Sequence, residues 1–247
     1  TKHTISRSYF KMNEMFECFE FTKHSKNPSR FHICESPGGF ITYCNEVFND
    51  LNYITISLKP GTDPKIPNYH YSLNTEKLLS KQISIDDNDI TKLSVMNFIA
   101  QKYRNSFDFI TADGGKVVNQ YDKQEIHCLK LITSELYLSL HTIKKNGTLI
   151  LKFFETFTIQ SKILLKIICL NFQDVYVNKP KTSRSTNSEK YVIAINFNGT
   201  PLFTNELIRI YYDKLDEDFL FISKPNNDII TNNIELLNLT LAERQGV

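Results

Sequence analysis

Apolar residues along the chain follow two alternating patterns. Short continuous runs, rich in β-branched and aromatic residues, end at Gly, Pro, Asn or Asp, which is typical of buried strands that stop at turns. Between them lie longer segments in which apolar residues recur at intervals of three and four, as in helices with one buried face. Strands are predicted over residues 30–35, 52–58, 82–85, 107–112, 148–154, 174–178 and 190–197. Helices are predicted over residues 40–48, 92–103, 129–143 and 159–170, with Asn146-Gly147 as the C-cap of the third.

This order of elements predicts an α/β fold. Strands that alternate with helices form a largely parallel sheet covered on both faces. The last two strands have only the polar loop 179–189 between them, so we expect a mostly parallel seven-stranded sheet with a final antiparallel hairpin. Residues 1–198 are expected to form one domain. Residues 199–247, with a helix-like piece over 202–214, are expected to be a C-terminal extension that packs on it or leads to another region.

Composition narrows the class of protein. Of the 247 residues, 41% are apolar and 23% are charged, which excludes wholesale disorder. No apolar run approaches the ~18 to 20 residues of a membrane-spanning helix, so no membrane partner is expected. The five cysteines form no CxxC pair and indicate reduced thiols inside a cell. The histidines and cysteines lack the spacing of a zinc site, and no metal is expected.

The small net charge of +2 hides a separation of charge along the chain. From Asp213 onwards seven acids outweigh three bases, which leaves −4 there and +6 on residues 1–212. Segments 1–30 and 177–190 each carry +3. Two basic segments on a folded body are typical of a surface that meets phosphates, although a solvated face of Lys and Arg explains the charge equally well.

Residues that directly follow the predicted strands are candidates for a binding site, because ligands of open α/β sheets sit beyond the carboxyl ends of the strands. The first strand runs into Glu35-Ser36-Pro37-Gly38-Gly39-Phe40. Its glycines allow close approach to the backbone, and a following helix N-terminus favours an anion; a plain tight turn explains the same residues. Lys152 stands inside the apolar strand 148–154, where an ammonium needs an ionic partner unless it snorkels at the strand end.

Six motifs, in this order, resemble those of FtsJ/RrmJ-type RNA ribose 2′-O-methyltransferases. They are Arg7-Ser8-Tyr9-Phe10-Lys11, Glu35 to Phe40, Asp87-Asn88-Asp89-Ile90-Thr91, Thr111-Ala112-Asp113-Gly114-Gly115, Leu151-Lys152-Phe153 and residues 179–192. The last four motifs are closest to those of the mRNA cap-specific (nucleoside-2′-O-)-methyltransferases of eukaryotes and large DNA viruses, and the final motif, residues 179–192, is the longest of them. The resemblance covers residues 7–197, and it implies a Rossmann-like domain that uses S-adenosylmethionine.

The resemblance also implies a catalytic tetrad of Lys11, Asp113, Lys152 and Glu189. Methyl transfer from a sulfonium to a ribose hydroxyl is an in-line displacement, so the hydroxyl must be held near the methyl carbon and lose its proton. We expect Lys152 to orient and deprotonate the 2′-hydroxyl. Burial and a neighbouring cation would lower its pKa, whereas the two acids would raise it. If the pKa shifts little, Lys152 acts by orientation and by stabilising the developing alkoxide.

Contacts with cofactor and RNA are expected at the same edge of the sheet. By resemblance, the cofactor-binding residues are Glu35 to Phe40, Asp89 for the adenine amine, and Asp113. Leu58-Lys59-Pro60 stands where many such folds have an acid for the cofactor ribose, and that contact is left open. Phosphates are expected to meet Arg7, Lys179, Arg184 and Lys190. The RNA ribose is expected to meet Ser185, Asn187 and Ser188.

The sequence therefore predicts an S-adenosylmethionine-dependent 2′-O-methyltransferase for the first transcribed nucleotides of capped mRNA. A ribosomal or transfer RNA 2′-O-methyltransferase is one alternative. The other is a non-catalytic RNA-binding or polymerase-associated subunit on the same scaffold, which an intact tetrad disfavours. The expected partners are the capped mRNA 5′ end and other capping or transcription proteins. The expected location is intracellular, in the cytoplasm, including a viral replication site, or in the nucleus.

Overall fold

The computed structural model describes residues 6–19, 21, 27–59, 61–62, 67–70, 81–116 and 124–203. Within these residues the strands are β1 (Arg30–Ile33), β2 (Tyr53–Ile56), β3 (Phe107–Ala112), β4 (Ile143–Phe153), β5 (Phe172–Asn178) and β6 (Lys190–Phe197). The helices are α1 (Ser8–Phe19), α2 (Gly39–Phe48), α4 (Leu93–Lys102), α5 (Gln124–Thr142) and α6 (Ile159–Asn171). The predicted extension beyond residue 203 lies outside the described residues, and the domain boundary at 198 stays a prediction.

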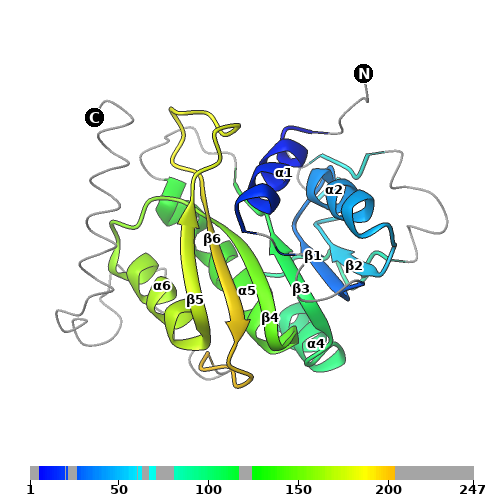
Figure 1. Cartoon of the computed structure of the whole chain (residues 1–247). Coiled ribbons are helices and arrows are strands. Elements are labelled where there is room, and N and C mark those ends of the chain that lie inside the picture. Colours follow the sequence, from blue (N-terminus) through cyan, green and yellow to red (C-terminus); the bar gives the residue numbers. More distant parts are fainter. Residues whose placement is uncertain are drawn as a thin grey trace.

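The described strands form one six-stranded sheet in the order β2-β1-β3-β4-β6-β5 (Figure 1). Strands β1 to β4 are parallel, whereas β6 runs antiparallel to both β4 and β5. The chain passes from β1 to β2 on one side and returns to β3 on the other. The carboxyl ends of β1 and β3 therefore flank the point at which the strand order reverses, where ligands of such sheets bind.

The predicted third strand, residues 82–85, is not a strand of the sheet. Only Gln82 forms an isolated parallel bridge, to Thr55 of β2. The side chain of Asn88 binds two backbone groups that a strand would use, because its Oδ1 accepts the N–H of Ile85 at 2.8 Å and its Nδ2 donates to the carbonyl oxygen of Ile83 at 3.0 Å. The prediction of seven strands is therefore wrong for the described part of the chain.

The Asn146-Gly147 pair is not a helix C-cap. Helix α5 ends at Thr142, and β4 begins at once, with Ile143 opposite Phe107 of β3. The pairing then shifts, so that Phe109 lies opposite Thr148. Asn146, with φ of 64°, and Gly147 occupy this irregularity inside β4. The prediction of a C-cap at this pair is therefore wrong, because both residues lie within a strand.

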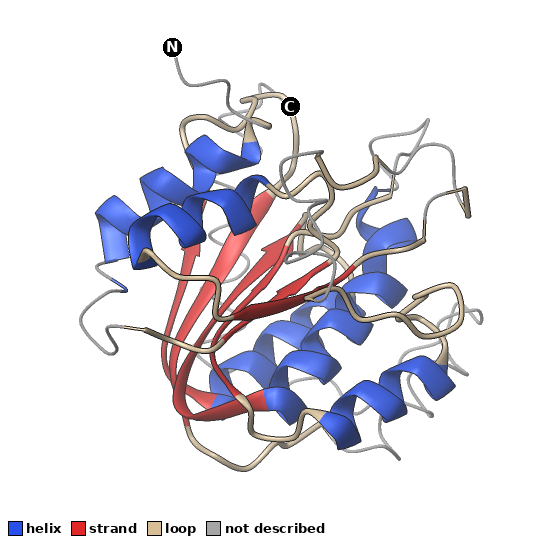
Figure 2. Ribbon diagram, turned by 90° about the vertical axis from the view of Figure 1, so that its right-hand side faces the viewer, coloured by secondary structure: helices blue, strands red, loops and turns tan. Residues whose placement is uncertain are grey.

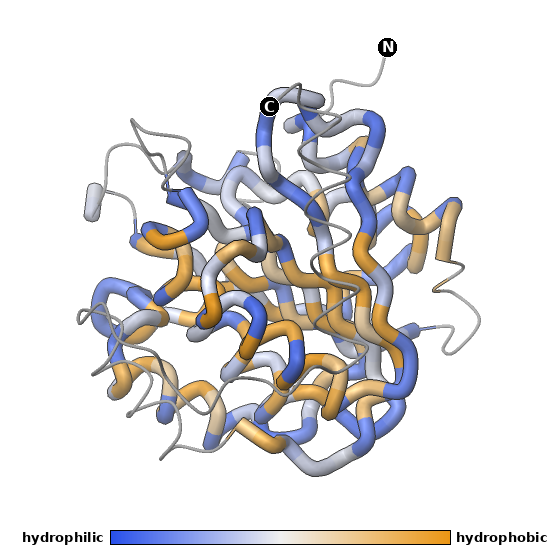
Figure 3. The backbone as a smooth tube through the Cα atoms, turned by 90° about the vertical axis from the view of Figure 1, so that its left-hand side faces the viewer, coloured by the Kyte–Doolittle hydropathy of each residue, from blue (hydrophilic) through white to orange (hydrophobic). Residues whose placement is uncertain are grey.

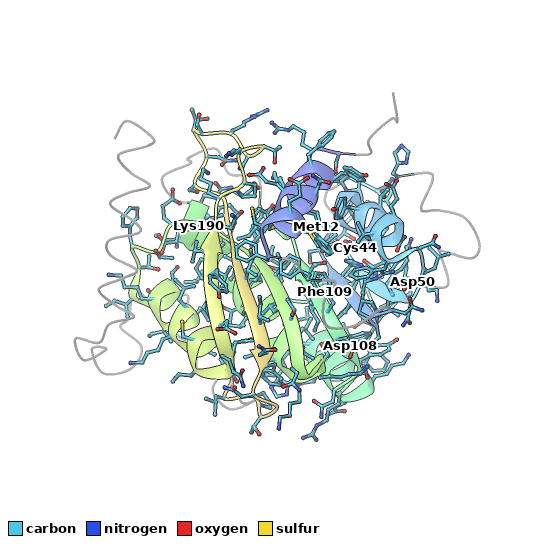
Figure 4. The ribbon with its side chains drawn as sticks, viewed as in Figure 1. Met12, Cys44, Asp50, Asp108, Phe109 and Lys190 are labelled. Atoms are coloured by element: carbon cyan, nitrogen blue, oxygen red, sulfur yellow. The ribbon has the colours of Figure 1, made fainter. Side chains whose placement is uncertain are left out.

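Helices cover both faces of the sheet (Figure 2). Helices α1 and α2 pack on one face, and α4, α5 and α6 pack on the other. The strands between them form an apolar centre (Figure 3). On the α1–α2 face, the buried residues Met12, Cys44 and Phe109 belong to one apolar cluster (Figure 4). Among the described helices, none has the length and apolar character needed to cross a bilayer.

Arg30 of β1 fixes helix α2 to the sheet. Its side chain is fully buried, and its Nη2 lies 2.6 Å from Oδ1 of Asp50. The guanidinium also donates to the carbonyl oxygens of Cys44 and Asp50, and it stacks 5.0 Å from the ring centroid of Phe48. These contacts hold the C-terminal end of α2, which in turn sets the position of the turn that precedes the helix.

We expect Asp50→Ala to destabilise the protein by about 3 kcal/mol, because the Arg30 guanidinium would stay buried without its carboxylate. Urea unfolding followed by circular dichroism measures this. Asp87→Ala, which breaks an exposed pair with Lys92, serves as the control and should leave stability nearly unchanged. Equal midpoints for the two variants would show that Arg30 does not depend on Asp50.

Candidate active site

A cavity of about 890 Å³ opens at the carboxyl edge of the sheet. Its volume is within the range of pockets that enclose small molecules. The walls come from residues that follow the parallel strands: Cys34 and Ser36 after β1, Ser57 and Leu58 after β2, Asp113 to Gly115 after β3, and Phe154 after β4. The cavity therefore lies at the reversal of strand order.

Four charged side chains form what we call the charged cluster: Lys11, Asp113, Lys152 and Glu189. The last three line the cavity, and Lys11 joins them through Glu189. Nζ of Lys152 lies 3.1 Å from Oδ1 of Asp113 and 3.8 Å from Oε2 of Glu189. Nζ of Lys11 lies 2.5 Å from Oε1 of Glu189. Each side chain is only 11 to 15% exposed. The structure thus brings together all four residues of the predicted tetrad.

The four residues come from separate parts of the fold. Lys11 lies on α1, Asp113 directly follows β3, and Lys152 is the penultimate residue of β4. Glu189 directly precedes β6, and it reaches the same edge because β6 runs antiparallel to β4. Tyr191, opposite Lys152 in the β4–β6 pair, donates its hydroxyl to Oδ1 of Asp113 at 2.8 Å. The antiparallel strand therefore supplies both a cluster member and its support.

The mutual charges of the cluster control its protonation. Burial alone would lower the pKa of Lys152, but the charges of Asp113 and Glu189 and a hydrogen bond to Asp113 prevail and raise it. Burial would raise the pKa of Glu189, but Lys152 and Lys11 prevail and lower it. The sequence left open whether burial or the neighbouring acids would determine the pKa of Lys152, and in the structure the effect of the acids is larger. Lys152 is therefore an ammonium at neutral pH in the protein by itself.

Two glycines behind Asp113 shape the space around the cluster. A Cβ on Gly115 would lie 3.3 Å from Nζ of Lys152, so the missing side chain keeps the approach to the ammonium open. A Cβ on Gly114 would lie 2.3 Å from Oε1 of Glu135, on helix α5. That oxygen accepts the N–H of Gly114 at 3.0 Å. The buried carboxyl group of Glu135 thus holds the backbone next to Asp113.

Only part of the predicted cofactor segment reaches the cavity. Ser36, Asp89 and Asp113 line it. Glu35 and Phe40 are 3% and 1% exposed and lie in the interior.

The remaining residues of the predicted cofactor segment after β1 determine the conformation of this turn and its packing. Glu35 accepts a hydrogen bond from Thr111 of β3 and lies 3.1 Å from Nδ1 of His32. A Cβ on Gly39 would lie 2.2 Å from Oγ of Ser8, so this glycine admits helix α1. Gly38, with φ of 105°, adopts a backbone conformation that favours glycine. Pro37 lies between these residues and Ser36.

The predicted RNA-binding residues divide into two groups. Arg7, Arg184 and Asn187 line the cavity, and Ser185 is exposed nearby in sequence. The other three residues are Lys179, Ser188 and Lys190. Lys179 forms hydrogen bonds within its own loop, and the other two are buried.

Lys190 is 1% exposed, at the start of β6 (Figure 4), so its prediction as a phosphate contact is wrong. Burial lowers its pKa to about 8 against the opposing charges of Glu155 and Glu125. Ser188 is 9% exposed. Nζ of Lys179 donates to the backbone oxygens of Asn187 and Glu189 at 2.5 and 2.9 Å, so it stabilises its own loop.

The sequence reasoning missed several lining residues. Ser57 and Leu58 directly follow β2, and Phe154 directly follows β4. The strand-end rule that selected Glu35 to Phe40 applies equally to them. Lys116 and Gln124 also line the cavity, and they follow no strand directly, so no comparable signal marks them.

Comparison with known proteins identifies the class. The solved structure of a protein assigned as a ribosomal RNA methyltransferase from Plasmodium falciparum has a TM-score of 0.56 and 20% sequence identity, covering 79% of this chain and 99% of that one. The fold is therefore that of a Rossmann-like methyltransferase. The sequence profile of the FtsJ-like methyltransferases matches residues 4–197, and the chain belongs to this family. It is an S-adenosylmethionine-dependent methyltransferase.

Viral relatives are among the most similar curated proteins. The protein of African swine fever virus named "Probable methyltransferase EP424R" is 29% identical, covering 98% of this chain and 68% of that protein. The cap-specific mRNA (nucleoside-2′-O-)-methyltransferase of Autographa californica nuclear polyhedrosis virus is 28% identical, covering 80% of this chain and 77% of that protein.

Glu135 gives the site a testable pH dependence. Burial raises its pKa from 4.5 to about 8 in the folded protein. In this interval the unfolded chain releases the proton while the folded protein keeps it, so the group's contribution to stability falls as pH rises through about 8. Glu135→Gln keeps the acceptor for Gly114 and removes this loss.

We therefore expect the stability of Glu135→Gln relative to the native protein to increase between pH 5 and 8, by at least about 2 °C in Tm. Below pH 4 the difference should stay constant. Thermal unfolding across this range measures it. Parallel stability curves for the two proteins would show that Glu135 is ionised in the fold.

Proposed function

We propose that this protein methylates the ribose 2′-hydroxyl of the first transcribed nucleotides of capped mRNA. The observation that carries the proposal is the charged cluster in a methyltransferase fold: Asp113, Lys152 and Glu189 line the cavity, and Lys11 pairs with Glu189 behind them. The likeness to a viral cap-specific 2′-O-methyltransferase over 80% of the chain supports the choice of substrate.

The wall of the cavity offers the groups that the cofactor needs. Ser36 lies at the reversal of strand order, where such folds bind cofactors, and Asp89 on the same wall supplies a carboxylate for an exocyclic amine. Ser57 and Leu58, at the end of β2, are candidates for the contact with the cofactor ribose that the sequence left open. When bound, S-adenosylmethionine supplies an electrophilic methyl group.

Lys152 is the residue that we assign to the target hydroxyl. The open space next to Gly115 leaves its ammonium accessible from the cavity, although it is mostly buried. As an ammonium it donates to the hydroxyl oxygen, holds it in line and stabilises the negative charge that develops there. Any further positive charge in the cavity lowers the pKa of Lys152 and favours the neutral amine, which accepts the hydroxyl proton.

The other cluster members control the position of Lys152. Asp113 holds its Nζ through both a carboxylate oxygen, at 3.1 Å, and its backbone carbonyl, at 2.9 Å. Glu189 balances the charge of Lys152 and of Lys11 together. This arrangement fixes the amine without covering the side that faces the cavity.

RNA is expected to enter beside helix α1 and the loop before β6. Arg7 and Arg184 are exposed and line the cavity, so they are suited to bind phosphates. Asn187, also on the wall, is suited to meet a ribose hydroxyl. Other capping or transcription proteins remain predicted partners of this protein.

The proposal is tested by tritium transfer from labelled S-adenosylmethionine to capped and uncapped RNAs of one sequence, followed by digestion to locate the labelled nucleotide. We expect label on the 2′-oxygen of the first nucleotides of the capped RNA. Equal transfer to uncapped RNA would favour a ribosomal or transfer RNA substrate. Absence of transfer to any RNA would favour a non-catalytic subunit.

Lys152→Ala should lower the rate of transfer by at least about 100-fold, because the hydroxyl loses both its orientation and its proton acceptor. The Kd for S-adenosylmethionine should change less than about threefold. Lys144→Ala, at the other end of β4 and paired with Asp108, is the matched control and should retain full activity. Substantial turnover by Lys152→Ala would remove this residue from the mechanism.

Asp89→Ala should weaken cofactor binding about tenfold, the effect of losing one charge-assisted hydrogen bond. Isothermal titration calorimetry with S-adenosylmethionine measures it. Lys92→Ala in the same region, which removes an exposed partner of Asp87 and lies outside the cavity lining, is the control and should bind normally. Because Oδ1 of Asp89 also accepts two hydrogen bonds from Thr91, equal Tm values should be checked first.

A further inference from the structure

One face of helix α1 holds the loop between β5 and β6 at two places. At one end of this loop, residues 179–189, Lys11 pairs with Glu189. One turn along the helix, Glu14 contacts the other end. Its Oε1 accepts the backbone N–H of Lys181 at 2.6 Å, and its Oε2 accepts the backbone N–H and the hydroxyl of Thr182 at 3.2 and 3.3 Å. A single carboxylate thus caps two consecutive backbone groups of the loop.

We propose that Glu14 is a positioning residue for the RNA substrate: it anchors the β5–β6 loop on helix α1, so that the loop forms its part of the cavity wall before RNA binds. This inference rests on the proposed function and adds to it a residue outside the cavity. Glu14 is not among the lining residues, whereas Arg184, Thr186 and Asn187 of the loop are.

Hydrogen bonds inside the loop transmit the effect of Glu14 to the cavity. Ser183 donates its hydroxyl to Oε1 of Glu189 at 2.9 Å and to Oδ1 of Asn187 at 3.1 Å. The N–H of Ser183 closes a turn on the carbonyl of Pro180 at 3.0 Å. Lys179 binds the far side of the loop through Asn187 and Glu189. The loop is therefore one connected piece, and the contact at residues 181 and 182 sets where the whole piece lies.

The contact is strong enough to affect binding and weak enough to spare the fold. Hydrogen bonds to a carboxylate are stronger than those between neutral groups, but this one is partly exposed to water. Without it, only a fraction of the molecules would hold the loop in its binding position. The apparent affinity for RNA falls by that fraction, whereas RNA once bound holds the loop in place.

The same two N–H groups and hydroxyl would also suit an RNA phosphate, which Glu14 would then have to vacate. That arrangement makes the opposite prediction, because removal of the carboxylate would strengthen RNA binding. The sign of the effect on RNA affinity therefore decides between an anchor and a competitor.

The variant that tests this is Glu14→Ala, and the matched control is Glu17→Ala. Glu17 lies on the same helix and is exposed, and its carboxylate accepts a hydrogen bond from the side chain of Asn13 rather than from the loop. We expect Glu14→Ala to raise the KM for a short capped RNA about tenfold, with kcat reduced less than about threefold and the Kd for S-adenosylmethionine unchanged. Glu17→Ala should match the native protein in all three. Glu14→Gln, which keeps one carbonyl oxygen as acceptor, should recover part of the loss.

Amide hydrogen exchange tests the anchor without any substrate. The amides of Lys181 and Thr182 should exchange faster in Glu14→Ala than in Glu17→Ala, while the amides of the central strands exchange equally in both. Unchanged exchange at these two amides, an unchanged KM or a lower KM would each overturn the proposal. If the native protein transfers no methyl group to capped RNA, the proposed function fails. The exchange result and the Kd of a fluorescent capped RNA still support or overturn the anchor.

Discussion

Two ammonium groups and two carboxylates must neutralise one another at the edge of this sheet, and the rest of the structure is arranged so that they can. Each side chain of the charged cluster is at least 85% buried, so each would lose several kcal/mol of hydration without its partners. None of the four comes from the same element as another. Helix α1 must therefore lie on the sheet, β3 and β4 must be neighbours, and the loop before β6 must fold back over the cavity.

A second layer of polar groups keeps the cluster in balance. Tyr191 donates to Asp113, and burial holds its pKa well above the usual range, so the hydroxyl remains a donor. Glu135 lies close behind and would add a third negative charge if it were ionised. Because its pKa is raised to about 8, it stays neutral near pH 7 and serves as an acceptor for the backbone of Gly114. The cluster thus keeps equal numbers of positive and negative charges.

The sequence was sufficient where local pattern decides the structure. The strands at 107–112 and 190–197 have the predicted bounds, because each is an apolar run between polar turns. It was insufficient where a distant contact decides. The side chain of Asn88 forms hydrogen bonds with the backbone at residues 82–85. Helix α1, whose buried face includes Met12 and Met15, was not predicted at all.

Side-chain direction was the harder problem at the site. Tyr191 lies opposite Lys152, so it faces the α1 side of the sheet, and the alternation of a strand then turns Lys190 to the opposite face. Charge counting placed Lys190 with the RNA contacts, although its position next to Tyr191 sends it into the interior. The hydrogen bonds of Lys179 were not predicted for another reason: its acceptors are carbonyl groups of its own loop, which no pattern of residue types reveals.

The antiparallel course of β6 has a consequence for how the protein is made. Because β6 runs antiparallel to β4, Glu189 lies at the same edge of the sheet as Lys11, Asp113 and Lys152, although it follows all three in the sequence. During synthesis, the cluster therefore lacks one of its two carboxylates until Glu189 follows Lys11 out of the ribosome, an interval on the order of ten seconds or more. Helix α1 precedes every described strand in the sequence, yet its charged contact needs Glu189, which directly precedes the last of them. The charged cluster can be complete only after residue 189 has been made, and a nascent chain interrupted before that residue leaves Lys11 and Lys152 with one carboxylate between them.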